Sequence, residues 1–104
     1  TGNGSADGPF VHCGLTPHWL WRWGISVGDN YYTNNALTSS YNPTNHRFIL
    51  DVAQAASTNA DIDITASGYK IRETTPNSSG TTYGSIVFGS RPFGGSGVSQ
   101  ARAR

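Results

Sequence analysis

Residues 18–25 read HWLWRWGI, and this stretch carries the strongest structural signal in the chain. Tryptophan occupies every second position, at 19, 21 and 23. A period of two places all three indoles on one face of a β-strand, whereas in a helix they would fan around the axis. Because the chain has few other large residues, we expect at least two indoles in the core, with Leu20 and Arg22 on a half-exposed face.

The composition around this strand indicates a β-rich, loop-rich protein. The chain has 104 residues, of which 36% are hydrophobic and only 12% charged, and its length corresponds to one domain. Glycine, serine, threonine and asparagine are abundant, and these residues favour turns, caps and strand ends over helix interiors. The many aromatic residues argue against disorder, because they supply large apolar side chains to bury.

Turn signals divide the chain into six or seven short strands. We expect strands at 9–13, 18–25, 31–33, 46–52, 61–65, 69–73 and 81–88. Such spacing predicts an all-β fold, an antiparallel β-sandwich with long polar loops. Glycine and asparagine in 28–30 favour a hairpin between the second and third strands. Strand 81–88 is apolar on both faces and is expected to be central, and 53–60 is the only stretch with helix-like chemistry.

The two ends of the chain differ from its middle in composition. Residues 1–8 contain three glycines and predict a flexible connector, followed by a β-sandwich domain over 9–93 and an extended tail over 94–104. The chain has no methionine. We therefore expect a domain joined to a larger protein or released from a precursor, with a short gene product that lost its Met as the alternative.

Few residues suggest catalysis. Asp61 and Asp63 alternate with isoleucines, so both carboxylates are expected on a solvent-exposed face, close to Lys70 and Arg72 across a hairpin. A glycan-hydrolase hypothesis would rest on this pair alone. The single cysteine, Cys13, excludes an internal disulfide and is expected to be a small buried hydrophobe.

Other ligand and partner classes lack a sequence signal. The three histidines, at 12, 18 and 46, follow no metal-ligand spacing, so we expect no catalytic residue, no cofactor and no metal. A net charge of +1 is too small for nucleic-acid binding through phosphate neutralisation. No run approaches the roughly 20 apolar residues of a membrane span, so no membrane insertion is expected.

An ordered series of sequence blocks resembles a known family. The blocks are 1–11, 14–20, 41–43, 62–64, 67–72, 80–83, Phe88, 91–93 and 101–104. In this order they resemble the C-terminal β-sandwich domain of bacteriophage virion proteins of the tail-fibre or tail-tip type. The resemblance implies a lectin-like, jelly-roll-like sandwich on the exterior of the phage particle.

The resemblance and the residues together lead to three functional hypotheses. The first is a non-enzymatic structural component that forms a homo-oligomer or assembles with other virion proteins. The second is a receptor-binding module for host-surface carbohydrate, in which aromatic side chains stack on sugars; its candidate residues are Trp21, Tyr31, Tyr32 and Tyr41. The third is a capsid decoration or head-fibre protein.

Overall fold

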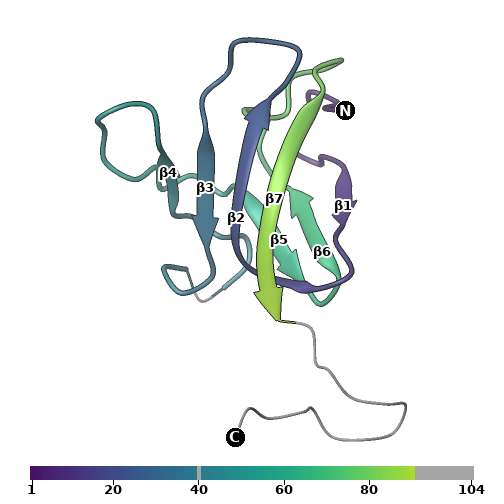
Figure 1. Ribbon diagram of the computed structural model, residues 1–104, viewed down its shortest axis with the longest axis vertical. Helices are drawn as coiled ribbons and strands as arrows, with labels where there is room; N and C mark the ends of the chain where they lie inside the picture. Colours follow the sequence, from purple (N-terminus) through teal and green to yellow (C-terminus); the bar gives the residue numbers. More distant parts are fainter. Residues whose placement is uncertain (40, 91–104) are drawn as a thin grey trace, which may run out of the picture.

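The computed structural model describes residues 1–39 and 41–90, in which every regular element is a β-strand (Figure 1). The seven strands are β1 (Phe10–His12), β2 (Thr16–Gly24), β3 (Tyr32–Asn35), β4 (Arg47–Ile49), β5 (Ile62–Thr65), β6 (Gly68–Ile71) and β7 (Tyr83–Ser90). The all-β prediction is confirmed, and each predicted strand is present with its ends shifted by only a few residues.

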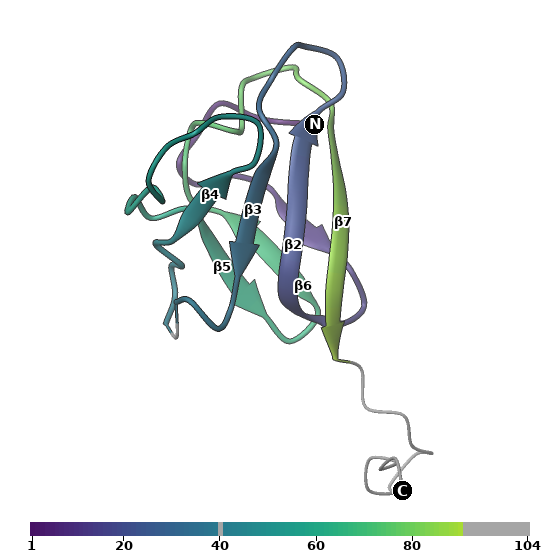
Figure 2. The ribbon, with the colours of Figure 1, turned by 60° about the vertical axis from the view of Figure 1, so that its left-hand side comes forward.

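The strands form two antiparallel sheets that lie as two layers (Figure 2). The smaller sheet has the order β1-β6-β5 and the larger has the order β4-β3-β2-β7. The predicted hairpins are present, since β2 pairs with β3 and β5 pairs with β6, with Ile62 opposite Ile71. Local turn chemistry therefore fixes the connections between sequence neighbours.

A small hydrophobic core lies between the two layers. Its buried members are Leu20 from the larger sheet and Ile62, Tyr69 and Ile71 from the smaller sheet. The partly buried residues that pack against them are Val11, Cys13, Ile64 and Val87. Burial raises the pKa of the Cys13 thiol, in keeping with its expected role as a small apolar side chain.

The alternation predicted for β2 is confirmed, but the predicted faces are reversed. Leu20 and Arg22 point into the core and are 0% and 2% exposed, while Trp19 on the opposite face is 40% exposed. Trp21 and Trp23 are half-buried on that outer side. The reversal has a long-range cause, because Arg22 finds its carboxylate partner only between the sheets.

The prediction that β7 is central is wrong. Within residues 1–39 and 41–90 it pairs only with β2 and forms the margin of the larger sheet (Figure 2). Val87 packs against the core, whereas Ile86 and Phe88 on the other face are exposed. The apolar residues on the outer face of β7 are therefore exposed to solvent, and no second layer of the described residues covers them.

The opening segment, predicted as a flexible connector, is held against the 77–81 loop. The backbone N–H of Gly2 donates to the Thr81 carbonyl at 2.8 Å, and that of Gly4 donates to the Asn77 carbonyl at 2.7 Å. A Cβ atom at Gly2 would lie 2.4 Å from a backbone oxygen, so the glycine allows a close approach of two chain segments. The predicted tail at 94–104 lies outside the described residues.

The segment 53–60 is not helical. Ser57 exchanges two backbone hydrogen bonds with Arg47 instead, and so continues the edge of the sheet at β4. Eight residues are too few for a stable isolated helix, and the serine, threonine and asparagine in this segment compete for backbone hydrogen bonds.

Candidate functional site

Asp61 is the centre of a polar cluster between the two sheets. It lies immediately before β5 and has no exposed surface. Its Oδ2 atom accepts hydrogen bonds from Nη2 of Arg22 at 2.6 Å and from Nδ2 of Asn34 at 2.7 Å. Nη2 of Arg22 also donates to Oδ1 of Asn34 at 2.9 Å. The three side chains thus form a closed hydrogen-bonded triangle in a region of low dielectric.

A second arginine completes this cluster. Nη1 of Arg47 lies 3.4 Å from Oδ1 of Asp61, pairs with Glu73 and donates to the Thr75 carbonyl at 2.9 Å. Its guanidinium lies 4.9 Å from the centre of the Tyr32 ring, a cation–π contact. We call Arg22, Arg47, Asp61 and Glu73 the charge network; its two positive and two negative charges cancel.

The expected pairing of Asp61 and Asp63 on one exposed face is wrong. Asp63 does lie on the strand and pairs with Nε of Arg72 at 2.6 Å. Asp61 precedes the strand, so strand alternation does not fix its direction, and it pairs with the buried arginines instead. The two carboxylates have no arginine partner in common, and neither lines the two cavities found among the described residues.

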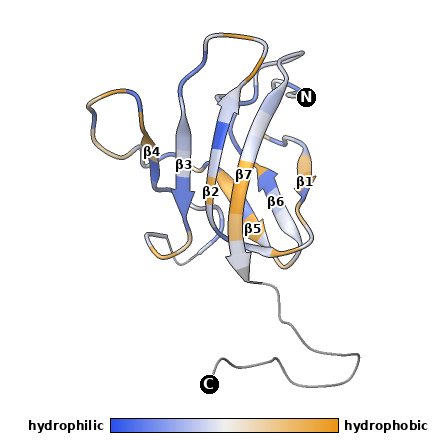
Figure 3. Ribbon diagram, viewed as in Figure 1, coloured by the Kyte–Doolittle hydropathy of each residue, from blue (hydrophilic) through white to orange (hydrophobic). Residues whose placement is uncertain are grey.

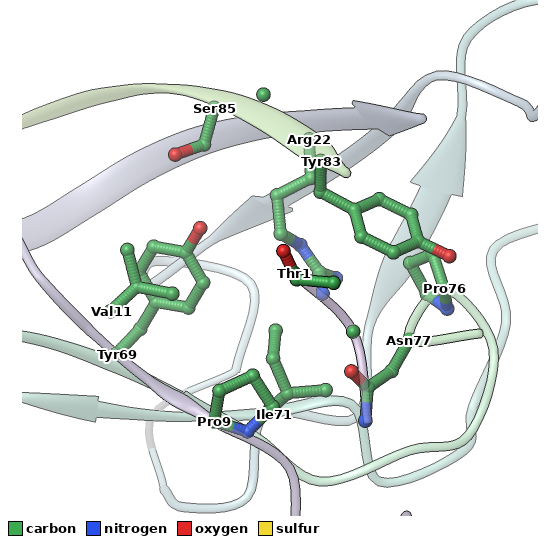
Figure 4. A pocket seen from close by; sticks show the side chains of 12 residues that line it. Thr1, Pro9, Val11, Arg22, Tyr69, Ile71, Pro76, Asn77, Tyr83 and Ser85 are labelled. Atoms are coloured by element: carbon green, nitrogen blue, oxygen red, sulfur yellow. The ribbon is translucent and has the colours of Figure 1, made fainter. Parts of the chain in front are cut away.

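Arg22 also borders a cavity of about 190 Å³ between β1 and β6 on one side and β2 and β7 on the other. Figure 4 shows its guanidinium among the lining side chains, with Tyr69, Ile71 and Tyr83 around it. Nε and Nη1 of Arg22 are buried and have no hydrogen-bond partner among residues 1–39 and 41–90. Nη2 of Arg22 therefore donates to Asp61 and Asn34, whereas Nε and Nη1 donate to no described residue.

The outer face of the larger sheet carries an aromatic strip. Its members are Trp19, Trp21, Trp23, Phe48, Ile86 and Phe88. Trp19 stacks on Phe88 with ring centres 5.5 Å apart and meets Trp21 edge to face at 5.3 Å. The indole N–H of Trp19 donates to Oγ1 of Thr33 at 2.7 Å.

This aromatic strip is uncharged and partly open to solvent. Figure 3 shows that the centre of β7 is apolar. Phe88 is 52% exposed, and the positions that face outward along β2, β3, β4 and β7 include no Asp, Glu, Lys or Arg. This uncharged aromatic surface is a candidate contact surface.

The four predicted ligand-binding residues do not form one platform. Trp21 lies in the aromatic strip, while Tyr31 and Tyr41 are exposed on separate loops. Tyr41 accepts a hydrogen bond from Asn45. Tyr32 points inward, is buried under Arg47 and donates from its hydroxyl to Asp29 at 2.8 Å. An aromatic side chain in the sequence therefore does not by itself predict whether the residue lies on the surface or packs in the interior.

Within the described ranges, no group of three or more His, Cys, Asp and Glu side chains is placed to hold a metal ion. In the same residues, no helix has the length and apolarity needed to cross a bilayer.

The sequence profile of one protein family, described as "Domain of unknown function (DUF7483)", matches residues 1–92. The chain belongs to this DUF7483 family. The matched range includes all seven strands, the charge network, the cavity and the aromatic strip. No curated protein and no solved structure matches this DUF7483 domain.

The first prediction concerns the charge network of the DUF7483 domain. Asp61→Asn leaves two buried guanidinium groups facing a neutral amide, and we expect it to lower the free energy of unfolding by about 3–5 kcal/mol. Asp63→Asn is the control, because its partner Arg72 is partly solvated, and it should cost at most about 1 kcal/mol. Urea unfolding measures both, and equal losses would contradict this assignment.

The second prediction concerns alkaline pH. Burial and the hydrogen bond to Asp29 raise the pKa of Tyr32 to about 12, against about 10 in an unfolded chain. The folded state holds this proton more tightly, so the stabilisation is complete below about pH 10 and is lost as the pH rises toward 12. We expect Tyr32→Phe to lose less stability than the wild type over this interval. Parallel losses in urea titrations at each pH would show that Tyr32 does not cause the dependence.

Proposed function

We propose that this DUF7483 domain is a non-enzymatic assembly domain of a bacteriophage virion, located in a tail fibre or tail tip on the particle exterior. There it would join copies of itself or neighbouring virion proteins. The ordered sequence blocks that resemble tail-fibre C-terminal domains support the virion setting. The two stacked antiparallel sheets are compatible with the lectin-like sandwich that this resemblance implies.

The observation that carries the proposal is the margin of the larger sheet at β7. Residues 83–90 include no charged residue and no proline, although soluble proteins commonly protect long edge strands with such residues. Within the described residues, β7 has no partner on the side away from β2. An unprotected edge of this length is suited to pairing with another strand.

The hydrogen-bond pattern identifies the backbone groups that face this edge. The N–H of Ile25 donates to the Thr82 carbonyl at 2.8 Å, and opposite residues in antiparallel strands alternate between bonded and non-bonded pairs. Residues 84, 86 and 88 therefore bond to β2. The N–H and C=O groups of Tyr83, Ser85 and Val87 point away from it.

A second copy fits this pattern. Antiparallel pairing of two β7 strands about a two-fold axis at Ser85 places Tyr83 opposite Val87 and brings all the outward groups into bonded pairs. Gly84 then lies opposite Ile86 on the outer face, and no like charges meet. The contact would extend the larger sheet across both copies and join their aromatic strips.

Sedimentation velocity with the Ser85→Pro variant tests the assembly proposal. Proline removes an N–H that points away from β2, so the internal ladder should remain while self-association weakens at least about tenfold. Ile86→Pro is the matched control, because it removes an N–H bonded to β2 and should lower the thermal stability of the domain instead. A wild type that stays monomeric at high concentration, or association unchanged by Ser85→Pro, would contradict the proposal.

A receptor-binding module for host-surface carbohydrate is the second candidate. The partial exposure of Trp19 and its ring contact with Trp21 favour it, because exposed indoles can stack on sugar rings. A capsid decoration or head-fibre location would use the same self-pairing at a different place on the particle.

A further inference from the structure

The aromatic strip is ordered by the register of the larger sheet. One row of directly opposite residues crosses β7, β2, β3 and β4 in turn, as Ile86, Trp21, Thr33 and Phe48. In the neighbouring row Trp19 lies opposite Phe88 and stacks on its ring. The large side chains therefore form a surface two rows wide, held in place by the strands beneath it.

Among the described residues, no strand covers this surface. The smaller sheet lies against the opposite side of the larger sheet (Figure 1). Four members of the strip, Trp19, Phe48, Ile86 and Phe88, are between 40% and 52% exposed. Because one aromatic side chain presents about 150–250 Å², these exposures correspond to roughly 300–400 Å² of apolar surface, a size that on a monomer is often functional.

One strip is too small to hold two copies together face to face. Stable interfaces bury about 800 Å² on each partner, roughly twice the area of one strip. The pairing of two β7 strands, which this inference takes from the proposed function, would double the surface. Opposite residues of an antiparallel pair project to the same side of a sheet, so the strips of both copies would lie on one face and together reach that area.

The chemistry of the strip indicates a second strip as its partner. The positions that face outward along β2, β3, β4 and β7 include no Asp, Glu, Lys or Arg, so two such faces can meet without contact between like charges. The indole N–H of Trp19 donates to Thr33, and that of Trp21 is buried. Neither ring therefore offers a donor to a polar ligand, whereas side chains of two apolar sheet faces can interdigitate.

We propose that two β7-paired dimers stack through their joined aromatic strips and form a tetramer with D2 symmetry. The inference rests on the proposed function and fixes an order of assembly. Edge pairing comes first because it creates a face large enough for stacking. Each dimer has one such face, so stacking closes the assembly at the tetramer.

Sedimentation equilibrium of the full chain over a wide concentration range tests this order. We expect monomer, dimer and tetramer for the wild type, and loss of dimer and tetramer together in Ser85→Pro. Phe88→Glu should weaken the association of dimers at least about tenfold and leave the dimer intact, because it places a charge in the stacked face and not at the paired edge. Phe10→Glu is the matched control, since Phe10 is a similarly exposed phenylalanine on β1 of the smaller sheet, and it should leave the tetramer unchanged.

The possible results separate this inference from the proposal beneath it. A wild type that stops at the dimer would overturn stacking and leave the β7 pairing intact, whereas a wild type that stays monomeric would contradict both. A tetramer that survives Phe88→Glu, or a dimer that persists in Ser85→Pro, would also overturn the stated order. The dimer formed by Phe88→Glu shows in the same experiment that this variant folds.

Tryptophan fluorescence identifies the face that is buried. The emission of the wild type should shift to shorter wavelength over the concentrations at which the tetramer forms, because Trp19 loses contact with water. Phe88→Glu should show no such shift at the same concentrations. A tetramer that forms without a shift would place the contact between dimers on another face and overturn the proposal.

Discussion

The buried ion pair between Arg22 and Asp61 determines how the two sheets face each other. A guanidinium cannot be buried without a partner, and the partner of Arg22 lies on the other side of the core. Because side chains alternate along a strand, the inward direction of Arg22 also turns Leu20 inward and the three indoles outward. One ion pair thereby decides which surface of the larger sheet is core and which is exposed.

The sequence was sufficient for the features that depend on neighbours along the chain. Strand positions follow from turn residues and from a period of two. The β5–β6 hairpin follows from a two-residue loop, and the β2–β3 hairpin follows from the glycine and asparagine in 28–30. Contacts between residues far apart in sequence decide the other features. These are which face of β2 is buried, the position of β7 at the margin of its sheet, and the burial of Asp61. The available sequence signal for the charge network is Arg22, which lies in the middle of the tryptophan run. The free energy expected from burying tryptophan favours the opposite orientation of the strand.

The same constraint shapes both surfaces discussed above. Turning the indoles outward produces an uncharged aromatic strip beside an unprotected edge strand, which is the arrangement expected of a domain that adds to another copy. Turning Arg22 inward places unused donors beside a cavity. Arg22 binds Asp61 through Nη2 alone, and its Nε and Nη1 atoms are buried without a hydrogen-bond partner among the described residues.

A double-mutant cycle measures the coupling on which this account depends. Arg22→Met, Asp61→Asn and the double variant would be compared with the wild type by urea unfolding. Because each single change leaves its partner buried without its shortest ion pair, we predict that the double variant is more stable than the sum of the single losses implies, by about 2–3 kcal/mol. Losses that add within about 0.5 kcal/mol would mean that the two residues do not determine the packing of the sheets.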